Sequence, residues 1–457
     1  MSLEIPPNTP EPISEKEPIP QRQNRLLRNI IIVNFFYRIF GASFMFMLPL
    51  FAVAKGWTDS YYGLVLAIGG YVAMGVAFFL GMIVDVRFKR TTMIIGLFAI
   101  IISAVLFSRF HIRALSIIFY CLYAVGQQLM MLSTNTFIAN ETEKGDKRTK
   151  GFSGNAFFTG VARIIAPLAC GYLLLVLDFD WVFLIMGVFG LISLILVFVL
   201  RLSVDETPSD ELAHANDLSV NSGDDYSAFN HEDKKEKHSV LGVQISFGFG
   251  RVLMGFTSGV AIPFVSWYIL TAFDPTTDLW GWITSISNIL LTLGYVFMAF
   301  MAEKIGKDII VVISWALVVP AAVGIMFAQS FFWAAFFFII RNFFARIPMA
   351  PWNSFLFEWI PPKNRGKTLG LLQTAQRGAR ASGTLLGGLS FALLGATLFP
   401  IAMTAYPIAG LLPMIQSKIV KKRFKDSFEK DKRKMENEEP PIQETYPSIE
   451  VVGGKVK

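Results

Sequence analysis

Residues 141–174, "ETEKGDKRTKGFSGNAFFTGVARIIAPLACGYLL", and residues 358–391, "EWIPPKNRGKTLGLLQTAQRGARASGTLLGGLSF", follow one pattern. In register, five like pairs coincide: Glu141 with Glu358, Arg148 with Arg365, Lys150 with Lys367, Arg163 with Arg380, and Gly171 with Gly388. A second match aligns "FFYRIFG" at 35–41 with "FGFGRVLMG" at 247–255, so that Arg38 pairs with Arg251. The sequence therefore predicts two similar halves in the same orientation.

The composition places both halves in a membrane. Hydrophobic residues make up 53% of the 457 residues and charged residues only 16%, whereas a soluble protein carries roughly 25% charged residues. The apolar residues also occur in blocks of about twenty, the length that spans a bilayer. The polar, Pro-rich start lacks the features of a signal peptide, so we expect the first apolar block to remain as a spanning helix.

The fold class that we predict is an all-α polytopic membrane protein, with twelve transmembrane helices in two pseudo-symmetric six-helix halves. The first six spans are expected near 29–50, 60–84, 92–110, 114–138, 155–177 and 181–200. The second six are expected near 243–270, 279–301, 309–328, 331–356, 368–394 and 396–417. The predicted regions are a Pro-rich tail (1–28), an N-terminal half (29–200), a central loop (201–240), a C-terminal half (241–417) and a charged tail (418–457).

The basic residues indicate how the chain lies across the membrane. One set of alternate loops, together with both tails, holds most of the Lys and Arg, whereas the opposite loops hold only Lys55, Arg109 and Arg113. By the positive-inside rule, both termini and the central loop are cytoplasmic, and we expect the cell membrane as location. The net charge of +7 is then a topology signal and predicts no nucleic-acid partner. Cys121 and Cys170 lie in apolar blocks, as small core residues do.

The segment "GMIVDVRFKR" at 81–90 resembles the loop signature of the major facilitator superfamily (MFS). The resemblance extends over nearly all of residues 29–417, and "MAEKIGK" at 301–307 is an eroded second copy. It implies a cytoplasmic gate network that stabilises one access state; the alternative is a set of solvated surface pairs worth under about 1 kcal/mol each. The gate candidates are Gly81, Asp85, Arg87, Lys89, Arg90, Glu141, Arg148, Glu303, Lys304, Glu358 and Arg365.

A third resemblance to this family is in the fifth span. "TGVARIIAPLACG" at 159–171 is similar to an antiporter-type motif through Gly160, Pro167 and Gly171, although Arg163 departs from the usual small residue. Close helix packing by small residues explains the glycines equally well.

Arginines lie deep inside the predicted spans. Arg38 is ten residues beyond Arg28, or about 15 Å along a helix, close to the middle of a bilayer core about 30 Å thick. Arg163 and Arg380 lie roughly 20 Å in, and Arg251 is at a depth similar to that of Arg38. A deep arginine should face the bundle interior. The spans hold almost no Asp or Glu, so either a solute supplies the anion or the arginines tie helices together.

We hypothesise that Arg38 and Arg251 face one another across a central cavity and attract an anionic solute. Polar amides in the spans are further candidates, with interhelical hydrogen bonding as the alternative role. The full set of candidate substrate-binding residues is Arg38, Arg251, Asn34, Gln127, Gln128, Asn135, Arg163, Arg380 and Asn353.

Two six-helix halves in one orientation are a transporter architecture, so we predict a secondary active transporter that works by alternating access. The sequence contains no phosphate-binding loop of the GxxxxGK[ST] kind, so nothing in it suggests that ATP drives transport. We predict no catalytic residue, metal site or cofactor. The expected partners are a small solute, which is an anion if the arginines bind it, a proton or sodium coupling ion and the lipid bilayer, with the chain as a monomer. The alternatives are a proton-coupled multidrug or metabolite exporter, a transporter-fold receptor and a polytopic membrane enzyme.

Overall fold

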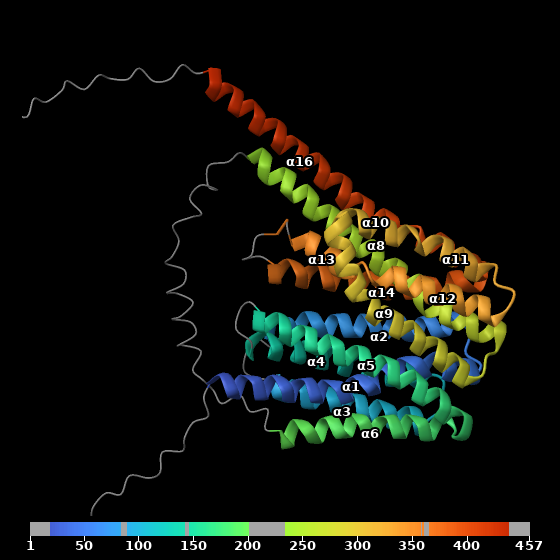
Figure 1. Ribbon diagram of the computed structural model, residues 1–457. Coiled ribbons are helices and arrows are strands. Elements are labelled where there is room, and N and C mark those ends of the chain that lie inside the picture. The colour runs from blue at the N-terminus through green and yellow to red at the C-terminus, as the bar shows by residue number, and fades with distance from the viewer. Residues whose placement is uncertain are drawn as a thin grey trace, which may run out of the picture.

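The computed structural model describes residues 19–83, 89–141, 146–200, 234–357, 359–360 and 365–437, and every regular element within them is helical. The N-terminal half consists of six helices that run back and forth through one bundle (Figure 1). They are α1 (Ile19–Ala54), α2 (Asp59–Ile83), α3 (Lys89–Arg109), α4 (Leu115–Glu141), α5 (Asp146–Val176) and α6 (Phe179–Val199).

The C-terminal half follows the same plan with more interruptions. Its helices are α8 (Lys234–Phe273), α9 (Thr277–Ile305), α10 (Lys307–Ala316), α11 (Val318–Met326), α12 (Phe331–Arg346), α13 (Met349–Phe357), α14 (Arg365–Leu394), the 3-10 turn η3 (Gly395–Thr397), α15 (Leu398–Met403) and α16 (Ala405–Asn437). The breaks between α10 and α11 and between α12 and α13 lie beside Pro320 and Pro348. Proline removes a backbone N–H and disfavours helix before it, which explains both breaks.

The helices reproduce the predicted spans. Ten segments of the described residues are long and apolar enough to cross a membrane. The last of them, Gly370–Lys422, has 53 residues and includes α14, α15 and α16, which is enough for two crossings of about 20 residues each. The 29-residue α9 packs between α5 and α12 although it is not one of the ten. The arrangement is consistent with twelve crossings.

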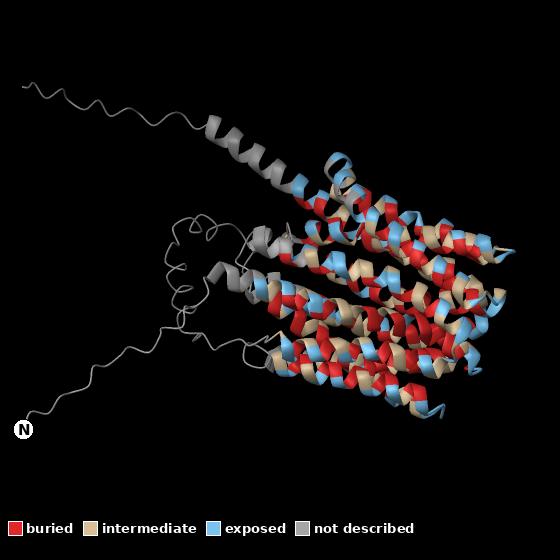
Figure 2. Ribbon diagram, turned by 60° about the horizontal axis from the view of Figure 1, so that its bottom comes forward, coloured by how far each residue is buried: buried red, intermediate tan, exposed pale blue. Residues whose placement is uncertain are grey.

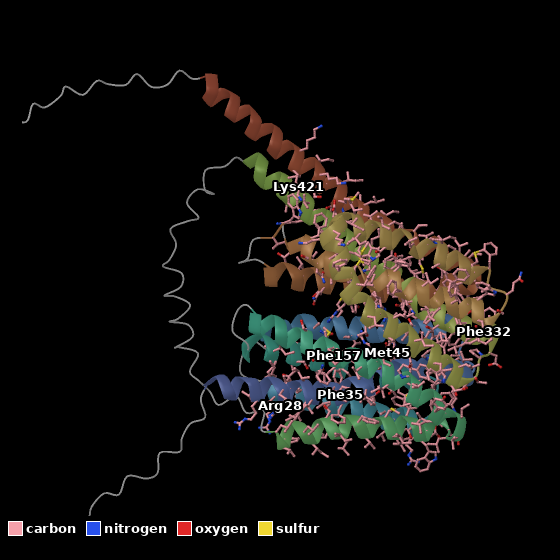
Figure 3. All side chains as sticks on the ribbon, in the orientation of Figure 1. Arg28, Phe35, Met45, Phe157, Phe332 and Lys421 are labelled. Carbon is pink, nitrogen blue, oxygen red and sulfur yellow. The ribbon has the colours of Figure 1, made fainter. Side chains whose placement is uncertain are left out.

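Both ends of the described chain lie at one end of the bundle, since α1 begins and α16 ends on the same side (Figure 1). We call this the termini end and the opposite one the far end. Arg28 lies toward the termini end and Phe332 at the far end (Figure 3). Buried residues run along the helices of both halves (Figure 2). The two halves meet where α2 packs on α14, α5 on α9 and α1 on α8.

Two glycine crossings hold the halves together toward the far end. A Cβ on Gly171 of α5 would lie 2.6 Å from the Thr277 carbonyl oxygen and 3.3 Å from the Gly281 Cα of α9. A Cβ on Gly388 of α14 would lie 2.9 Å from the Asp59 carbonyl oxygen and 3.1 Å from the Gly63 Cα of α2. Only glycine permits backbones to approach this closely, as in other packed membrane helices.

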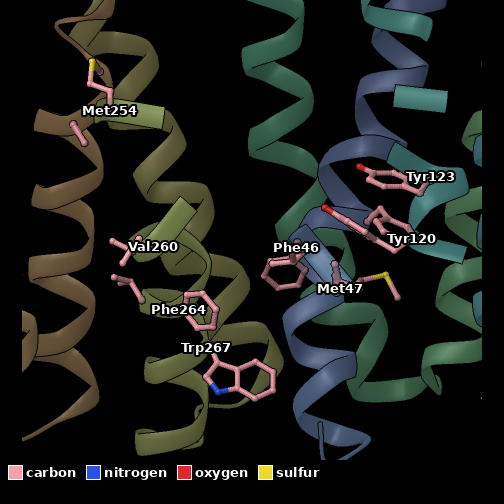
Figure 4. Close-up of a cluster of buried hydrophobic side chains, with 14 of the residues drawn as sticks. Phe46, Met47, Tyr120, Tyr123, Met254, Val260, Phe264 and Trp267 are labelled. Atoms are coloured by element: carbon pink, nitrogen blue, oxygen red, sulfur yellow. The ribbon is translucent and has the colours of Figure 1, made fainter. Parts of the chain in front are cut away.

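A tryptophan connects the halves at the same end. Trp267 of α8 is 2% exposed and donates its indole N–H to Asp59 Oδ1 at 2.6 Å. Its ring also stacks on Tyr62 of α2, with centroids 4.7 Å apart. Phe46 on α1 lies on the side of that helix that faces α8 (Figure 4). The far end is therefore closed in this structure.

Candidate functional site

Arg38 lies on α1 between Phe35 and Met45, which are both labelled in Figure 3. Its side chain is half-buried, and its guanidinium carbon is 5.1 Å from the centroid of the Tyr37 ring. The Arg38 Nε is buried with no hydrogen-bond partner among the described residues. The guanidinium therefore keeps unused donor capacity close to the middle of the helix.

Arg38 belongs to a group of arginines that spans both halves. Arg163 of α5 lies within electrostatic range of Arg38 and of Arg346 on α12. Arg346 in turn lies within range of Arg380 on α14, and Arg380 within range of Arg377. We call Arg38, Arg163, Arg346 and Arg380 the arginine cluster. It joins α1 and α5 of one half to α12 and α14 of the other.

The arginine cluster has no acidic counterpart nearby. The acidic residues of the described part of the chain lie at the ends of helices or on α16 beyond the membrane segment. The salt bridges between described side chains join His111 to Asp180 and Lys418 to Asp308, and neither involves the cluster. Arg163 and Arg380 both keep solvent-accessible surface. The arrangement can accept an anion from outside the protein.

The backbone around Arg163 explains how α5 meets the other half. Pro167, four residues later, has no N–H, so it cannot bond the Arg163 carbonyl as an ordinary helix residue would. Asn288 of α9 supplies the missing donor, with its Nδ2 3.0 Å from the Arg163 carbonyl oxygen. Ser285 adds a bond from its hydroxyl to the Ile164 carbonyl oxygen at 2.7 Å. The arginine therefore lies at a junction that hydrogen bonds hold in register.

Arg251 has a different environment from Arg38. It is 4% exposed, and it donates to Asn353 Oδ1 and, at 3.1 Å, to Gln376 Oε1. Its guanidinium carbon lies 5.0 Å from the centroid of the Trp352 ring. All of these partners belong to the C-terminal half. The structure therefore brings Arg38 together with Arg163, whereas Arg251 and Asn353 are bound to each other within their own half.

Two of the predicted amides tie helices of the N-terminal half together. Asn34 donates to Asn155 Oδ1 on α5 at 2.5 Å, and both residues are buried. Gln127 of α4 accepts from the Tyr37 hydroxyl at 2.9 Å and donates to the Tyr123 hydroxyl at 2.5 Å. Gln128 is buried on the same helix, and Asn135 is exposed.

The predicted gate falls largely outside the described residues. Asp85, Arg87 and Glu358 are not among them, and only the helical backbone is described for Gly81, Lys89, Glu141, Arg148, Glu303 and Arg365. Two gate candidates are described, and each lies over an aromatic ring. The Arg90 guanidinium carbon is 5.5 Å from the Phe198 ring centroid, and Lys304 Nζ is 4.2 Å from that of Phe300. The acid–base pairs of the gate stay a prediction.

The sequence analysis missed Arg346 of the cluster and Arg341, one and a half turns before it on α12. Both stand in "FFWAAFFFIIRNFFAR", where two arginines interrupt an apolar span. The depth argument applied to Arg38 would have found them. It also missed Tyr37 and Asn155, whose roles depend on neighbours that only the fold reveals.

Two pseudo-symmetric helical halves that enclose polar groups at mid-depth define a polytopic membrane transporter. Residues 30–239 and 247–447 match the Major Facilitator Superfamily, one half in each segment. The chain belongs to that family, which is one of membrane transporters and not of enzymes. No curated protein sequence matches the chain.

Solved structures share the fold. A peptide transporter, POT, in complex with alafosfalin superposes with a TM-score of 0.69 at 13% identity, over 89% of this chain and 99% of that chain. The nucleoside transporter NupG gives 0.61 at 13% identity, over 87% and 100%. A D-xylose-proton symporter gives 0.61 at 17% identity, over 87% and 97%. These likenesses confirm the fold.

Proposed function

We propose that this protein is a secondary active transporter that carries an anionic organic solute by alternating access. The arginine cluster binds the anionic group of the solute between the two halves. The observation that carries this proposal is a chain of four arginines from both halves, each within electrostatic range of the next, with no described carboxylate at their depth.

The physical argument is one of uncompensated charge. A guanidinium stays ionised in proteins, and several of them in a low-dielectric interior repel one another. None of the four arginines is fully buried, but no counter-charge offsets their repulsion, so an anion that enters the site stabilises it. Each charged hydrogen bond to such an anion contributes about 1.5–3 kcal/mol. Residues from both halves must converge to make all of these bonds, which couples binding to the movement of the halves.

Orientation and coupling are part of the same proposal. With cytoplasmic termini, the closed far end faces outward, and the solute exchanges with the cytoplasm in this conformation. We propose the cell membrane as location and a proton or sodium ion as coupling ion. In the alternating-access cycle, the glycine crossings at the far end separate while the gate residues at the termini end come together.

Ligand-dependent thermal unfolding of the detergent-purified protein tests the proposal. The panel contains inorganic phosphate, a sugar phosphate, a dicarboxylate and an uncharged sugar, and uptake of the best ligand into proteoliposomes follows. We expect anions to raise the unfolding temperature and Arg163→Gln to weaken their binding by about tenfold or more. Arg163→Lys retains the charge but loses the planar fork, so it should bind with intermediate affinity.

Arg109→Gln is the matched control, because Arg109 is an exposed arginine at the far end of α3. It should leave anion binding unchanged. If Arg163→Gln lowers the unfolding temperature but leaves anion affinity as in the unmodified protein, the arginine is structural and the proposal fails.

A further inference from the structure

A second unpaired guanidinium lies inside the C-terminal half, separate from the proposed solute site. Arg341 is ten residues beyond Phe331, where α12 begins at the far end, and ten residues correspond to about 15 Å of helix. That distance places it near the middle of a hydrocarbon core about 30 Å thick. Only 1% of its surface is exposed, so water reaches it far less than it reaches Arg163.

Arg341 uses a small part of its donor capacity. Its Nη1 donates to Asn342 Oδ1 at 2.7 Å, and the Asn342 Nδ2 reaches Ser287 Oγ of α9 at 3.4 Å. Its Nε and Nη2 are buried with no hydrogen-bond partner among the described residues. The Tyr406 ring of α16 and the guanidinium of Arg346 lie within electrostatic range. The positive charge of Arg346 adds to the need for an anion at this place.

An ionised group that is fully buried with free donors costs several kcal/mol unless something compensates it. The described residues provide no carboxylate here, since their acids lie at helix ends. Two guanidinium nitrogens with free N–H donors, with a phenol and a second cation within electrostatic range, form a recognition pattern for an anion. The near-complete burial of Arg341 leaves no route for an organic solute, so the anion must be small.

We propose that Arg341, together with the Tyr406 hydroxyl, binds a small monovalent inorganic anion such as chloride inside the C-terminal half. The ion offsets the charge of Arg341 and stabilises the packing of α12 against α9. It is a resident ion and not the transported solute. Arg341 itself is not a member of the arginine cluster, although Arg346 of the cluster lies within electrostatic range of it, so the two proposals are tested by separate variants.

Thermal unfolding of the full-length protein in detergent tests the site. Sodium chloride replaces sodium gluconate in steps at constant ionic strength. We expect the unfolding temperature to rise saturably by about 2 °C, because a ligand that binds only the folded state stabilises it. Arg341→Met, which has a similar length but no charge, should lose this rise. Arg163→Gln, a variant of the proposed solute site, should retain it.

The two variants separate this proposal from the previous one. A chloride response that persists in Arg341→Met but disappears in Arg163→Gln places the ion in the arginine cluster and overturns the present proposal alone. The present proposal is also overturned if chloride does not change the unfolding temperature of the unmodified protein. In that case the free nitrogens of Arg341 are satisfied without an ion.

Should Arg341→Met not fold, the unmodified protein decides the question through bromide. Crystals grown in sodium bromide should give an anomalous difference peak within hydrogen-bond distance of the Arg341 guanidinium. Bromide peaks only elsewhere would overturn the proposal.

Discussion

The α5–α9 junction and the α2–α14 junction are counterparts in the two halves, yet they hold together in different ways. The repeat aligns Gly171 with Gly388 and Arg163 with Arg380, and each glycine lies at the closest approach of its junction. The position of Pro167 in α5 corresponds to Thr384 in α14. Asn288 of the opposite half bonds the Arg163 carbonyl, whereas the Thr384 hydroxyl bonds the Arg380 carbonyl within its own helix, at 2.8 Å.

The comparison distinguishes two features of a junction between the halves: the close approach of the two helices and the hydrogen bonds that fix their register. Close approach through glycine is common to both junctions. Hydrogen bonds to the backbone of the opposite helix are concentrated at α5–α9, where Thr277, Ser285 and Asn288 all donate across. The α2–α14 junction has a weaker bond from Ser60 to the Gly388 carbonyl at 3.5 Å. The α5–α9 junction therefore fixes the register, and α2–α14 can slide more easily.

The largest effect is expected from filling the glycine crossings. Gly171→Leu and Gly388→Leu should each disfavour the closed far end by about 3 kcal/mol or more, since the added carbons meet backbone that cannot move aside. That corresponds to more than a hundredfold change in the ratio of the two conformers. Spin-label distances across the far end measure this ratio.

Gly370→Leu is the control on α14, because a Cβ at Gly370 has nothing within 4 Å. It should leave the distances unchanged. An effect of Gly388→Leu no larger than that of Gly370→Leu would show that the glycine crossing does not close the junction.

Trp267→Phe is expected to be the next largest change. It removes the donor to the Asp59 carboxylate and preserves an aromatic ring beside Tyr62. A hydrogen bond to a charged group contributes about 1.5–3 kcal/mol, so the closed conformer should lose about 2 kcal/mol in the same distance measurement. Trp282→Phe removes a neutral bond to the exposed Tyr172 hydroxyl and should cost less. Equal costs for the two variants would rule out a special role for Asp59.

A double-mutant cycle sharpens the difference between the junctions. Asn288→Ala leaves the Arg163 carbonyl unbonded and should cost about 1 kcal/mol of the closed conformer. Pro167→Ala restores the helical N–H, so Asn288→Ala should cost almost nothing in that background. The cycle should therefore show a coupling of about 1 kcal/mol in thermal unfolding. Thr384→Ala is the control and should change stability little, because residue 384 has its own backbone N–H. If Asn288→Ala costs the same in the unmodified protein and in Pro167→Ala, the account is refuted.

The smallest effect is expected at the exposed edge of the α2–α14 junction. Tyr71 and Ser382 share a hydrogen bond of 2.7 Å between their hydroxyls, and Tyr71 is 38% exposed. Tyr71→Phe should change the unfolding free energy by about 0.5 kcal/mol, because water replaces the lost partner. A change above about 2 kcal/mol would mean that this junction relies on hydrogen bonds as α5–α9 does.

The helix spans and the pairing of Gly171 with Gly388 could be predicted from the sequence. Bilayer length and hydropathy determine where an apolar helix crosses, and the internal repeat identifies the positions that both halves kept. Gly171 and Gly388 were paired in this way, and both lie at close backbone contacts between the halves.

The remaining site residues could not be found from the repeat. Arg341 and Arg346 correspond to Ala124 and Leu129 in the first half, so the comparison of halves passes over them. The depth of a residue follows from its place in a span, but its partners follow from the rotation of the helix about its axis. For that reason the pairing of Arg38 with Arg251 was a natural hypothesis, although the fold surrounds Arg251 with Trp352, Asn353 and Gln376.

The two arginines of α14 also bear on how the chain enters the bilayer during synthesis. Arg377 and Arg380 lie about 18 and 22 Å from the start of the helix, and an arginine near the centre of a span opposes insertion by about 2.5–3.5 kcal/mol. Together they oppose insertion of an isolated α14 by about 5–7 kcal/mol. α14 packs mainly on α8 and on α2. Insertion of α14 thus depends on helices that are already in the membrane, and α8 of its own half and α2 of the N-terminal half are the ones that it packs on.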